Sequence, residues 1–388
     1  MKKLIYVDNN ATTCVADEVI EKMFPFFKEF YGNPSSMYPF ALESKIPIEK
    51  AREQVAKFIN AERTDEIIFT SCGTESDNAA IIGILNAFPD KKHFITSAVE
   101  HQAIHAFSHK LEKTGYRVSR ISVDEEGLLN LDELRDEICD DTALISLMWA
   151  NNETGVIFPI EEAAAIAGEK GIPFHTDAVQ AAGKIEIDVQ KTGIDLLSVS
   201  GHKIHAPKGV GMLYVKRGTR LRPFLIGGHQ EHNRRAGTEN VPGIVGFGKA
   251  CEIAGEFIED EVNRVGALRD KLESEILKGI PETSVVGSKK YRTPNTTNII
   301  FKYVEGEAIL LMMADKGICA SSGSACTSGS PEPSHVLSAM KVPMAVAHSA
   351  IRFSLSRYNT EADIDYIISE LPPIIERLRE MSPLTPRK

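Results

Sequence analysis

The chain has 388 residues, of which 43% are hydrophobic, so it can bury a large core and is longer than one small domain. Its 44 Lys and Arg residues face 54 Asp and Glu residues, a net charge of −10, and no basic run predicts a nucleic-acid partner. The apolar run before Asp8 is too short for a secretion signal, and no run has membrane length. We therefore expect a cytoplasmic protein of two domains, without a membrane partner.

The six cysteines are scattered along the chain and form no Cys-x-x-Cys pair, which argues against a disulfide framework or a zinc knuckle. They indicate a reducing compartment. His101, His105 and His109 recur at spacings of four, as metal ligands on a helix can, but no acidic ligand accompanies them. No metal site is predicted, and His105 and His109 are expected to be solvated.

Apolar runs rich in β-forming residues alternate with helical patterns through the first part of the chain, which predicts an α/β fold with a mostly parallel central sheet. In such sheets, ligands bind beyond the carboxyl ends of the strands. Gly73, His101, Asn152, Asp177 and Ser200 each follow a strand-like run, so we expect one shared crevice. The runs cover residues 66–70, 93–98, 118–123, 143–149, 172–176, 195–199 and 210–215.

After residue 243 the pattern changes to a long charged helix, predicted over 244–277, in which a second, smaller α+β domain begins. The elements expected beyond it are strands near 283–286 and 297–302, a helix over 306–315, a strand over 350–355 and an amphipathic helix over 361–381.

Lys203 lies just after the apolar run 195–199, with Ser200 and His202 beside it. A partly desolvated lysine that loses its proton can condense with an aldehyde cofactor. A single lysine in a Gly- and Pro-rich turn is usually only a solvated turn residue. The assignment therefore depends on further cofactor-binding signals.

Two such signals lie upstream. Asp177 ends an apolar run, where a buried carboxylate would suit a protonated pyridine nitrogen, and Gln180 follows within reach of a ring hydroxyl. Gly73 and Thr74 open a helix directly after a strand, so free backbone amides there suit a phosphate. Taken alone, this turn would be an ordinary helix-capping sequence.

These signals, in the order phosphate turn, acid and lysine, resemble the cysteine desulfurases of the NifS/IscS type. The resemblance runs over nearly the whole chain and rests on these segments: 6–13 (YVDNNATT), 32–36 (GNPSS), 71–76 (SCGTES), 99–101 (VEH), 150–155 (ANNETG), 177–180 (DAVQ), 200–203 (SGHK), 235–240 (RAGTEN), 322–326 (SGSAC) and 351–354 (IRFS).

The resemblance implies a fold type I enzyme similar to the class V aminotransferases, dependent on pyridoxal 5'-phosphate (PLP). It implies conversion of L-cysteine to L-alanine. Lys203 would then be the cofactor-linked base, His101 would stack on the cofactor ring and assist proton transfer, and Arg352 with Asn152 would bind substrate. The cofactor-binding set implied is Gly73, Thr74, His101, Asn152, Asp177, Gln180, Ser200, His202, Lys203 and Thr238.

Cys326 lies in a segment rich in Ser, Gly and Pro, residues 321–334, whose composition predicts an exposed, mobile loop. By itself it could be an incidental surface thiol. By resemblance it takes sulfur from the substrate as a persulfide and passes it to an acceptor such as an iron-sulfur scaffold. It is also a candidate transient ligand of a cluster shared with that scaffold.

The resemblance also predicts the assembly and the domains. The counterpart of Thr238 reaches the cofactor phosphate of the other subunit, which implies a homodimer. A large PLP-binding domain is expected over 14–255, and a small domain over 1–13 together with 256–388, which carries the Cys326 loop.

Four residues depart from the pattern of the family: Tyr38, Ala206, His229 and Ala236. They concern the substrate entrance and the phosphate site. The short segment after Met381 favours the NifS over the housekeeping IscS type. The alternatives are a selenocysteine lyase, another PLP-dependent lyase or aminotransferase, and a non-enzymatic scaffold-binding partner. Cys326 separates a desulfurase from the other lyases and aminotransferases, and substrate preference separates it from a selenocysteine lyase. A cofactor absorbance lost on Lys203→Ala would count against the non-enzymatic partner.

Overall fold

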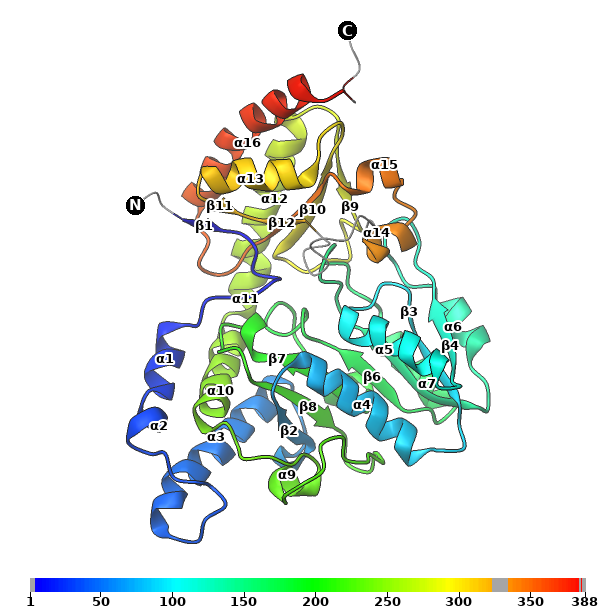
Figure 1. The fold of residues 1–388 in the computed structure, drawn as a ribbon, viewed down its shortest axis with the longest axis vertical. Helices are drawn as coiled ribbons and strands as arrows, with labels where there is room; N and C mark the ends of the chain where they lie inside the picture. Colours follow the sequence, from blue (N-terminus) through cyan, green and yellow to red (C-terminus); the bar gives the residue numbers. More distant parts are fainter. Residues whose placement is uncertain (1–3, 323–333, 384, 386–388) are drawn as a thin grey trace.

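The structure is a computed structural model that describes residues 4–322, 334–383 and 385 (Figure 1). Cys326, for which the sequence predicts the persulfide role, lies outside the described residues.

A seven-stranded sheet with the strand order β2-β8-β7-β6-β5-β3-β4 forms the centre of the larger part of the molecule. Its strands pair in parallel except β8, which is antiparallel to both β2 and β7. The prediction of a mostly parallel sheet is therefore confirmed. The strands are β2 (Ile67–Thr70), β3 (His93–Ser97), β4 (Arg117–Ile121), β5 (Thr142–Met148), β6 (Phe174–Asp177), β7 (Leu196–Ser200) and β8 (Gly211–Val215).

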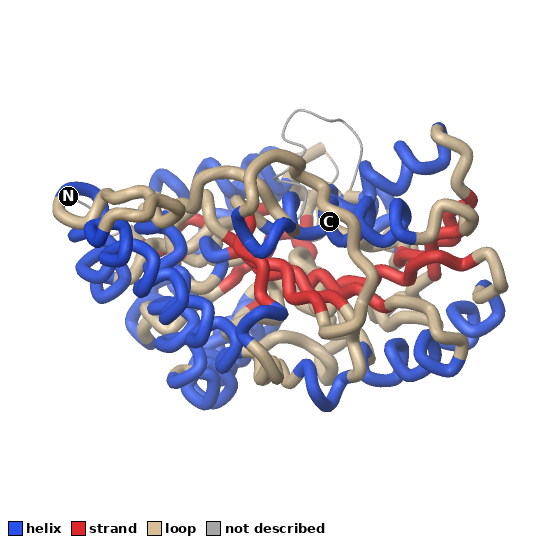
Figure 2. Tube along the Cα trace, turned by 90° about the horizontal axis from the view of Figure 1, so that it is seen from below, coloured by secondary structure: helices blue, strands red, loops and turns tan. Residues whose placement is uncertain are grey.

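Helices cover both faces of this sheet, as the band of strands between helices in Figure 2 shows. The helices of this part are α1 (Asp17–Met23), α2 (Pro25–Lys28), α3 (Leu42–Phe58), α4 (Gly73–Ala87), α5 (Gln102–Lys113), α6 (Leu131–Glu137), α7 (Ile160–Glu169), α8 (Val189–Thr192), α9 (Gln230–Asn233) and α10 (Val241–Glu256), with short 3-10 turns η1 (Pro39–Ala41), η2 (Thr64–Glu66) and η3 (Gly201–Lys203).

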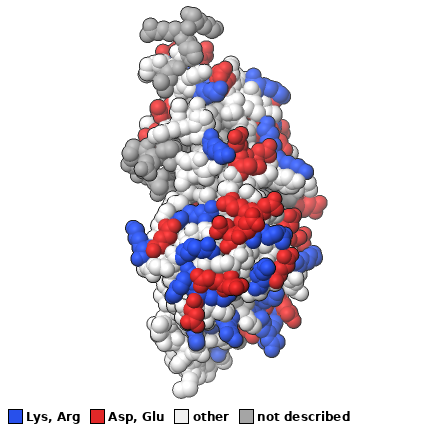
Figure 3. Space-filling view, turned by 90° about the vertical axis from the view of Figure 1, so that its right-hand side faces the viewer, with Lys and Arg blue, Asp and Glu red and all other residues white. Residues whose placement is uncertain are grey.

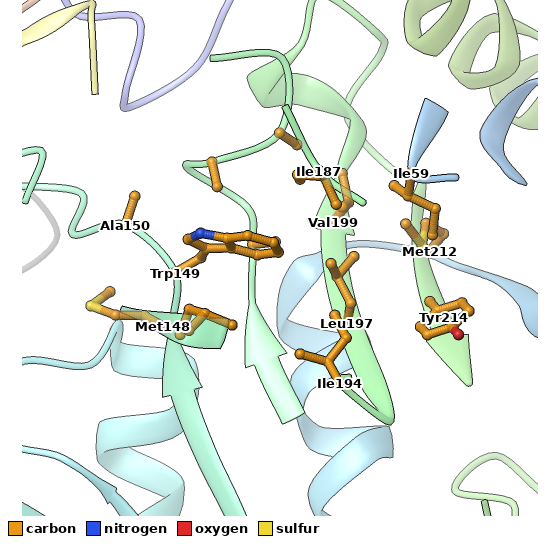
Figure 4. Packing of buried hydrophobic residues seen from close by; sticks show 14 of the residues in the cluster. Ile59, Met148, Trp149, Ala150, Ile187, Ile194, Leu197, Val199, Met212 and Tyr214 are labelled. Atoms are coloured by element: carbon orange, nitrogen blue, oxygen red, sulfur yellow. The ribbon is translucent and has the colours of Figure 1, made fainter. Parts of the chain in front are cut away.

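The strands alternate their side chains between two hydrophobic clusters. Leu196 and Leu213 pack with α4 and α5 in one cluster, whereas Leu197 and Met212 pack with α3, α7 and α10 in the other. Figure 4 shows Leu197 and Met212 within the second of these clusters. Because successive strand residues point to opposite faces, a strand that is buried on both sides is mostly apolar along its whole length. This explains the continuous apolar runs of the sequence.

A third hydrophobic cluster lies in the part of the molecule drawn at the top of Figure 1. It includes Ile5 and Val7 from the N-terminal segment, because β1 pairs in parallel with β11. The elements there are β1 (Ile5–Tyr6), α11 (Ile258–Asp260), α12 (Gly266–Gly279), β9 (Thr283–Val286), β10 (Thr296–Phe301), α13 (Gly306–Asp315), β11 (Ile318–Cys319), β12 (Ser321–Ser322), α14 (His335–Ala339), α15 (Met344–Ala347), β13 (Ala350–Ser354) and α16 (Glu361–Met381).

The predicted division into 14–255 and 1–13 with 256–388 stays a prediction, which this separate cluster supports. Some later residues, among them Val336 and Ala350, pack instead with the core of the larger part. The two parts therefore share an extended apolar contact.

The single long helix predicted over 244–277 is wrong. The chain forms α10, a short α11, a π-helical turn η4 (Glu261–Val265) and α12. A π-turn changes which side of a helix is buried, and here Phe247 of α10 joins one cluster while Val265 and Leu272 join another. Sequence periodicity does not show such a change of register.

The face seen in Figure 3 carries acidic and basic side chains interspersed, without a large area of one sign. Within the described residues, we find no helix that combines the length and the apolar character needed to cross a bilayer.

Candidate active site

A cavity of about 340 Å³ opens beyond the carboxyl ends of the parallel strands, where the sequence predicts the crevice. Side chains from the loops after β2, β3, β5, β6 and β7 meet there, together with the N-terminal segment and β13. The lining residues are Asn10, Ala11, Cys72, Gly73, Thr74, Asp77, His101, Met148, Ala150, Asn152, Asp177, Val179, Gln180, Ser200, His202, Lys203 and Arg352.

Lys203 ends the 3-10 turn that directly follows β7. Its Nζ donates hydrogen bonds to the carbonyl oxygens of Asn10, at 2.5 Å, and Ala11, at 2.7 Å. Gln180 donates to the same Asn10 oxygen, at 3.0 Å. Backbone carbonyls of the N-terminal segment thus hold the amine at the cavity wall, so the lysine is not a freely solvated turn residue.

Asp177, at the end of β6, is buried and accepts a hydrogen bond from the Val179 backbone N–H at 2.9 Å. Burial raises the pKa of Asp177, whereas His101 and Lys203 act in the opposite direction and favour its carboxylate form. A bound cation would strengthen the same effect, because opposite charges stabilise each other in a buried site. Asp177 is therefore suited to face a protonated ring nitrogen.

His101 caps the start of α5, where its Nδ1 accepts a hydrogen bond from the Ala103 backbone N–H at 3.2 Å. Burial lowers the pKa of His101, and the nearby Lys203 lowers it further, although Asp177 raises it. In the neutral ring, Nδ1 is then the acceptor and Nε2 carries the proton. His101 therefore offers a neutral imidazole to the cavity.

The start of α4 forms a cup that fits a phosphate. A Cβ atom added at Gly73 would lie 2.9 Å from Val179 Cγ2 and 3.4 Å from Ser200 Cβ, so this glycine keeps the cup open. Ser200 Oγ is buried and has no hydrogen-bond partner among the described residues. A buried hydroxyl without a partner, beside free amides at a helix N-terminus, fits the phosphate of PLP.

His202 lines the same cavity, with Nδ1 3.1 Å from Thr12 Oγ1. Burial, with a contribution from Lys203, lowers the pKa of His202 to about 4. It is therefore neutral at physiological pH and can give or accept a hydrogen bond.

Arg352 reaches the cavity from β13 and is buried. Its Nη2 donates to Asp8 Oδ1 at 2.7 Å and its Nη1 to the Asn152 carbonyl oxygen at 2.9 Å. Its Nε is buried and has no hydrogen-bond partner among the described residues. This guanidinium is placed to bind a carboxylate.

The cavity brings together all but two of the site residues that the sequence predicts. Thr238 is exposed and does not line the cavity, and Cys326 lies outside the described residues. None of the four residues that depart from the family pattern lines the cavity.

Sequence reasoning did not assign roles to Asn10, Ala11 and Asp77. The first two act through backbone carbonyls, which leave no trace in side-chain type. Asp77 lies one helical turn after Gly73, a spacing that could have placed it on the same face of α4.

The histidines of α5 differ from expectation. His101 is the capping residue and not part of the helix body. His105 is only partly exposed, because its ring packs 4.4 Å from that of His335, measured between ring centroids. His109 is exposed and lies 3.0 Å from Glu112, in agreement with the expectation.

A model of the aminotransferase class-V family matches residues 5–367. The chain belongs to this family and is a PLP-dependent enzyme. Within it, the chain belongs to the cysteine desulfurases, as the resemblance predicted. It is 55% identical over 379 residues to cysteine desulfurase NifS of Azotobacter vinelandii, covering 98% of this chain and 94% of that one. It is 56% identical over 382 residues to cysteine desulfurase 2 of Trichormus variabilis (strain ATCC 29413 / PCC 7937), covering 98% and 96%.

Solved structures agree with this placement. A NifS-like protein has a TM-score of 0.91 and 38% identity, over 97% of this chain and 100% of that one. SspA, solved in complex with cysteine, has a TM-score of 0.80 and 35% identity, over 93% and 100%.

Proposed function

We propose that this protein converts L-cysteine to L-alanine, passes the sulfur to Cys326 as a persulfide and delivers it to an acceptor for iron-sulfur cluster assembly. The observation that carries this proposal is the convergence of Lys203, Asp177, the Gly73 cup and Arg352 on one cavity in a chain of the cysteine desulfurase family.

PLP, when bound, supplies an electron sink for the carbanion that forms at the substrate α-carbon. The Gly73 and Thr74 amides with the Ser200 hydroxyl would hold its phosphate. Asp177 would keep its ring nitrogen protonated, and His101 would cover the ring as a neutral imidazole. Lys203 would act as the base that removes the α-proton, from the position that the Asn10 and Ala11 carbonyls define.

The sulfur step balances without an added oxidant. The Cys326 thiolate attacks the substrate sulfur and forms a new S–S bond, while the carbon–sulfur bond of the substrate breaks. The electron pair of that bond stays with the carbon, which is protonated and becomes the methyl group of alanine. Arg352 and Asn152 would hold the substrate carboxylate during this step.

The proposed assembly is a homodimer in the cytoplasm. Thr238 is exposed and away from the cavity of its own chain, as expected of a residue that serves the cofactor phosphate of the partner. Large apolar side chains are also exposed from α1 to the start of α3, and a second copy would cover them. They are Ile20, Phe24, Phe27, Tyr31, Met37, Tyr38, Phe40, Leu42 and Ile46.

The test measures release of alanine and sulfide from L-cysteine in the presence of a reductant. The purified protein is compared with Cys326→Ala after both show the visible cofactor band. Cys139→Ala is the matched control, because Cys139 is exposed and does not line the cavity. We expect both products from the parent and the control, and neither from Cys326→Ala.

Full activity of Cys326→Ala would instead assign a direct lyase. A parent that binds the cofactor and yet releases neither product from L-cysteine would overturn the proposed substrate. A strong preference for L-selenocysteine in the same assay would assign the selenocysteine lyase alternative.

A further inference from the structure

Asp77 is a buried carboxyl group at the wall of the cavity that the reaction described above does not use. It is 1% exposed, and its Oδ1 has no hydrogen-bond partner among the described residues. His175 could carry a positive charge, and its Nε2 lies 3.8 Å from Asp77 Oδ1. This distance is too long for a hydrogen bond.

His175 lies on β6, two residues before Asp177, and its two ring nitrogens face serine hydroxyls on the neighbouring strands. Nδ1 is 2.8 Å from Ser146 Oγ and Nε2 is 2.9 Å from Ser198 Oγ. All three residues are fully buried. Burial lowers the pKa of His175 to about 3, so the ring is neutral and supplies no positive charge to Asp77.

The charged groups that act on Asp77 are unfavourable to its carboxylate form. Burial is the largest cause that raises its pKa, and Asp177, Glu100 and Cys72 raise it further. Of the main causes, a hydrogen bond with Ser198 lowers it. Lys203 and His101, by contrast, favour the carboxylate form of Asp177. None of the main groups that act on the pKa of Asp77 is a cation, whereas Lys203 lowers the pKa of Asp177.

We propose that Asp77 is a positioning residue that keeps a proton at neutral pH, so that Asp177 is the aspartate that ionises toward the cofactor ring. The hydrogen bonds that link Asp77, Ser198, His175 and Ser146 then all run in one direction. Asp77 donates to Ser198, Ser198 donates to His175 Nε2, and His175 Nδ1–H donates to Ser146. A second carboxylate in this site would lack a cation and would hinder ionisation of Asp177.

This inference concerns the cofactor site of the proposed function, but its test does not need turnover of L-cysteine. Infrared spectra of the holoenzyme at pH 7 are compared with those of Asp77→Asn. We expect a carbonyl band of a protonated carboxylic acid, sensitive to D₂O, that is present in the parent and absent from the variant. If Asp77→Asn instead lacks carboxylate bands that the parent has, Asp77 is ionised at pH 7 and the proposal is overturned.

Glu100→Gln is the matched control, because Glu100 is another buried acid that acts on Asp77, and burial raises its pKa to about 8. Its removal should leave the band assigned to Asp77 in place. If Asp77→Asn does not fold, Ser198→Ala takes its place. The carbonyl band of protonated Asp77 should then shift, because its hydrogen bond to the Ser198 hydroxyl is lost. An unshifted band would contradict the proposed series of hydrogen bonds.

The pH at which the visible cofactor band changes gives a second readout. A protonated Asp77 and an asparagine have the same charge, so this midpoint should be the same in the parent and in Asp77→Asn. An ionised Asp77 would stabilise a nearby positive charge, and its replacement would lower the midpoint by about 1 unit or more. Such a fall would overturn the proposal, whereas a purely structural defect would not produce it in a variant that retains its fold.

Discussion

The hydroxyl of Ser334 donates a hydrogen bond to Glu153, with Oγ 2.6 Å from Oε2, and both residues are buried. The same hydroxyl accepts hydrogen bonds from the backbone N–H groups of Val336, at 3.1 Å, and Leu337, at 3.4 Å, and so caps α14. Glu153 directly follows the cavity residue Asn152. The start of α14 is thereby fixed to the cavity wall.

This contact predicts a pH-dependent stability. Burial raises the pKa of Glu153 from 4.5 to about 7, although Ser334 and Arg352 act against the shift. At a pH between these two pKa values, Glu153 keeps its proton in the folded chain but has lost it in the unfolded chain. Stability therefore falls as the pH rises through this window. Across this window the free energy of unfolding falls by roughly 3 kcal/mol. A glutamine at this position does not titrate, and its side-chain oxygen can still accept the hydrogen bond from the Ser334 hydroxyl. The free energy of unfolding of Glu153→Gln, relative to that of the parent, should therefore be higher at pH 8 than at pH 5.

Urea unfolding of both proteins at the two pH values measures this difference. Replacement of the exposed Glu125 by Gln controls for loss of a surface charge. An equal stability difference at pH 5 and pH 8 would show that Glu153 is ionised throughout.

Gly73→Ala should weaken cofactor binding. The added methyl group would meet Val179 at 2.9 Å within the proposed phosphate cup. Overpacking of this kind costs about 1–3 kcal/mol, which corresponds to a dissociation constant for PLP raised about tenfold or more. Gly168→Ala is the matched control, because a Cβ there meets nothing within 4 Å and Gly168 also lies in a helix. Titration of the apoprotein with PLP measures both. Equal affinities would place the phosphate elsewhere.

Lys203→Ala should abolish the covalent cofactor link and lower the rate of alanine formation by roughly 10²–10⁴-fold, the range typical for loss of a general base. The visible band of the linked cofactor should disappear. Lys208→Ala serves as the control, since Lys208 is exposed in the same loop and does not line the cavity. An unchanged band in Lys203→Ala would show that Lys203 is not the residue linked to the cofactor.

The fold and most of the site could be predicted from local patterns because the same physics produces both. Most parallel strands are buried on two faces and so appear as apolar runs, and many of the site residues follow where such a run ends. The edge strand β4 is an exception, because it is partly exposed. The antiparallel pairing of β8 was not predictable in this way, since a buried strand has the same composition in either direction. The acceptors of Lys203 are backbone atoms, so no side-chain pattern reveals them.

Arg352→Lys should mainly impair substrate binding. The planar guanidinium contacts Asp8 and Asn152 with two separate nitrogens, and its Nε remains available for a further acceptor. A lysine ammonium is a point charge without this fork geometry. Loss of a charge-assisted hydrogen bond costs about 1.5–3 kcal/mol, so KM for L-cysteine should rise about tenfold or more, with a smaller change in kcat. Steady-state kinetics separate the two parameters, and Arg264→Lys, which pairs with Asp260 at the surface, is the control. An unchanged KM with a reduced kcat would assign Arg352 to the chemical step and leave the substrate carboxylate to another group.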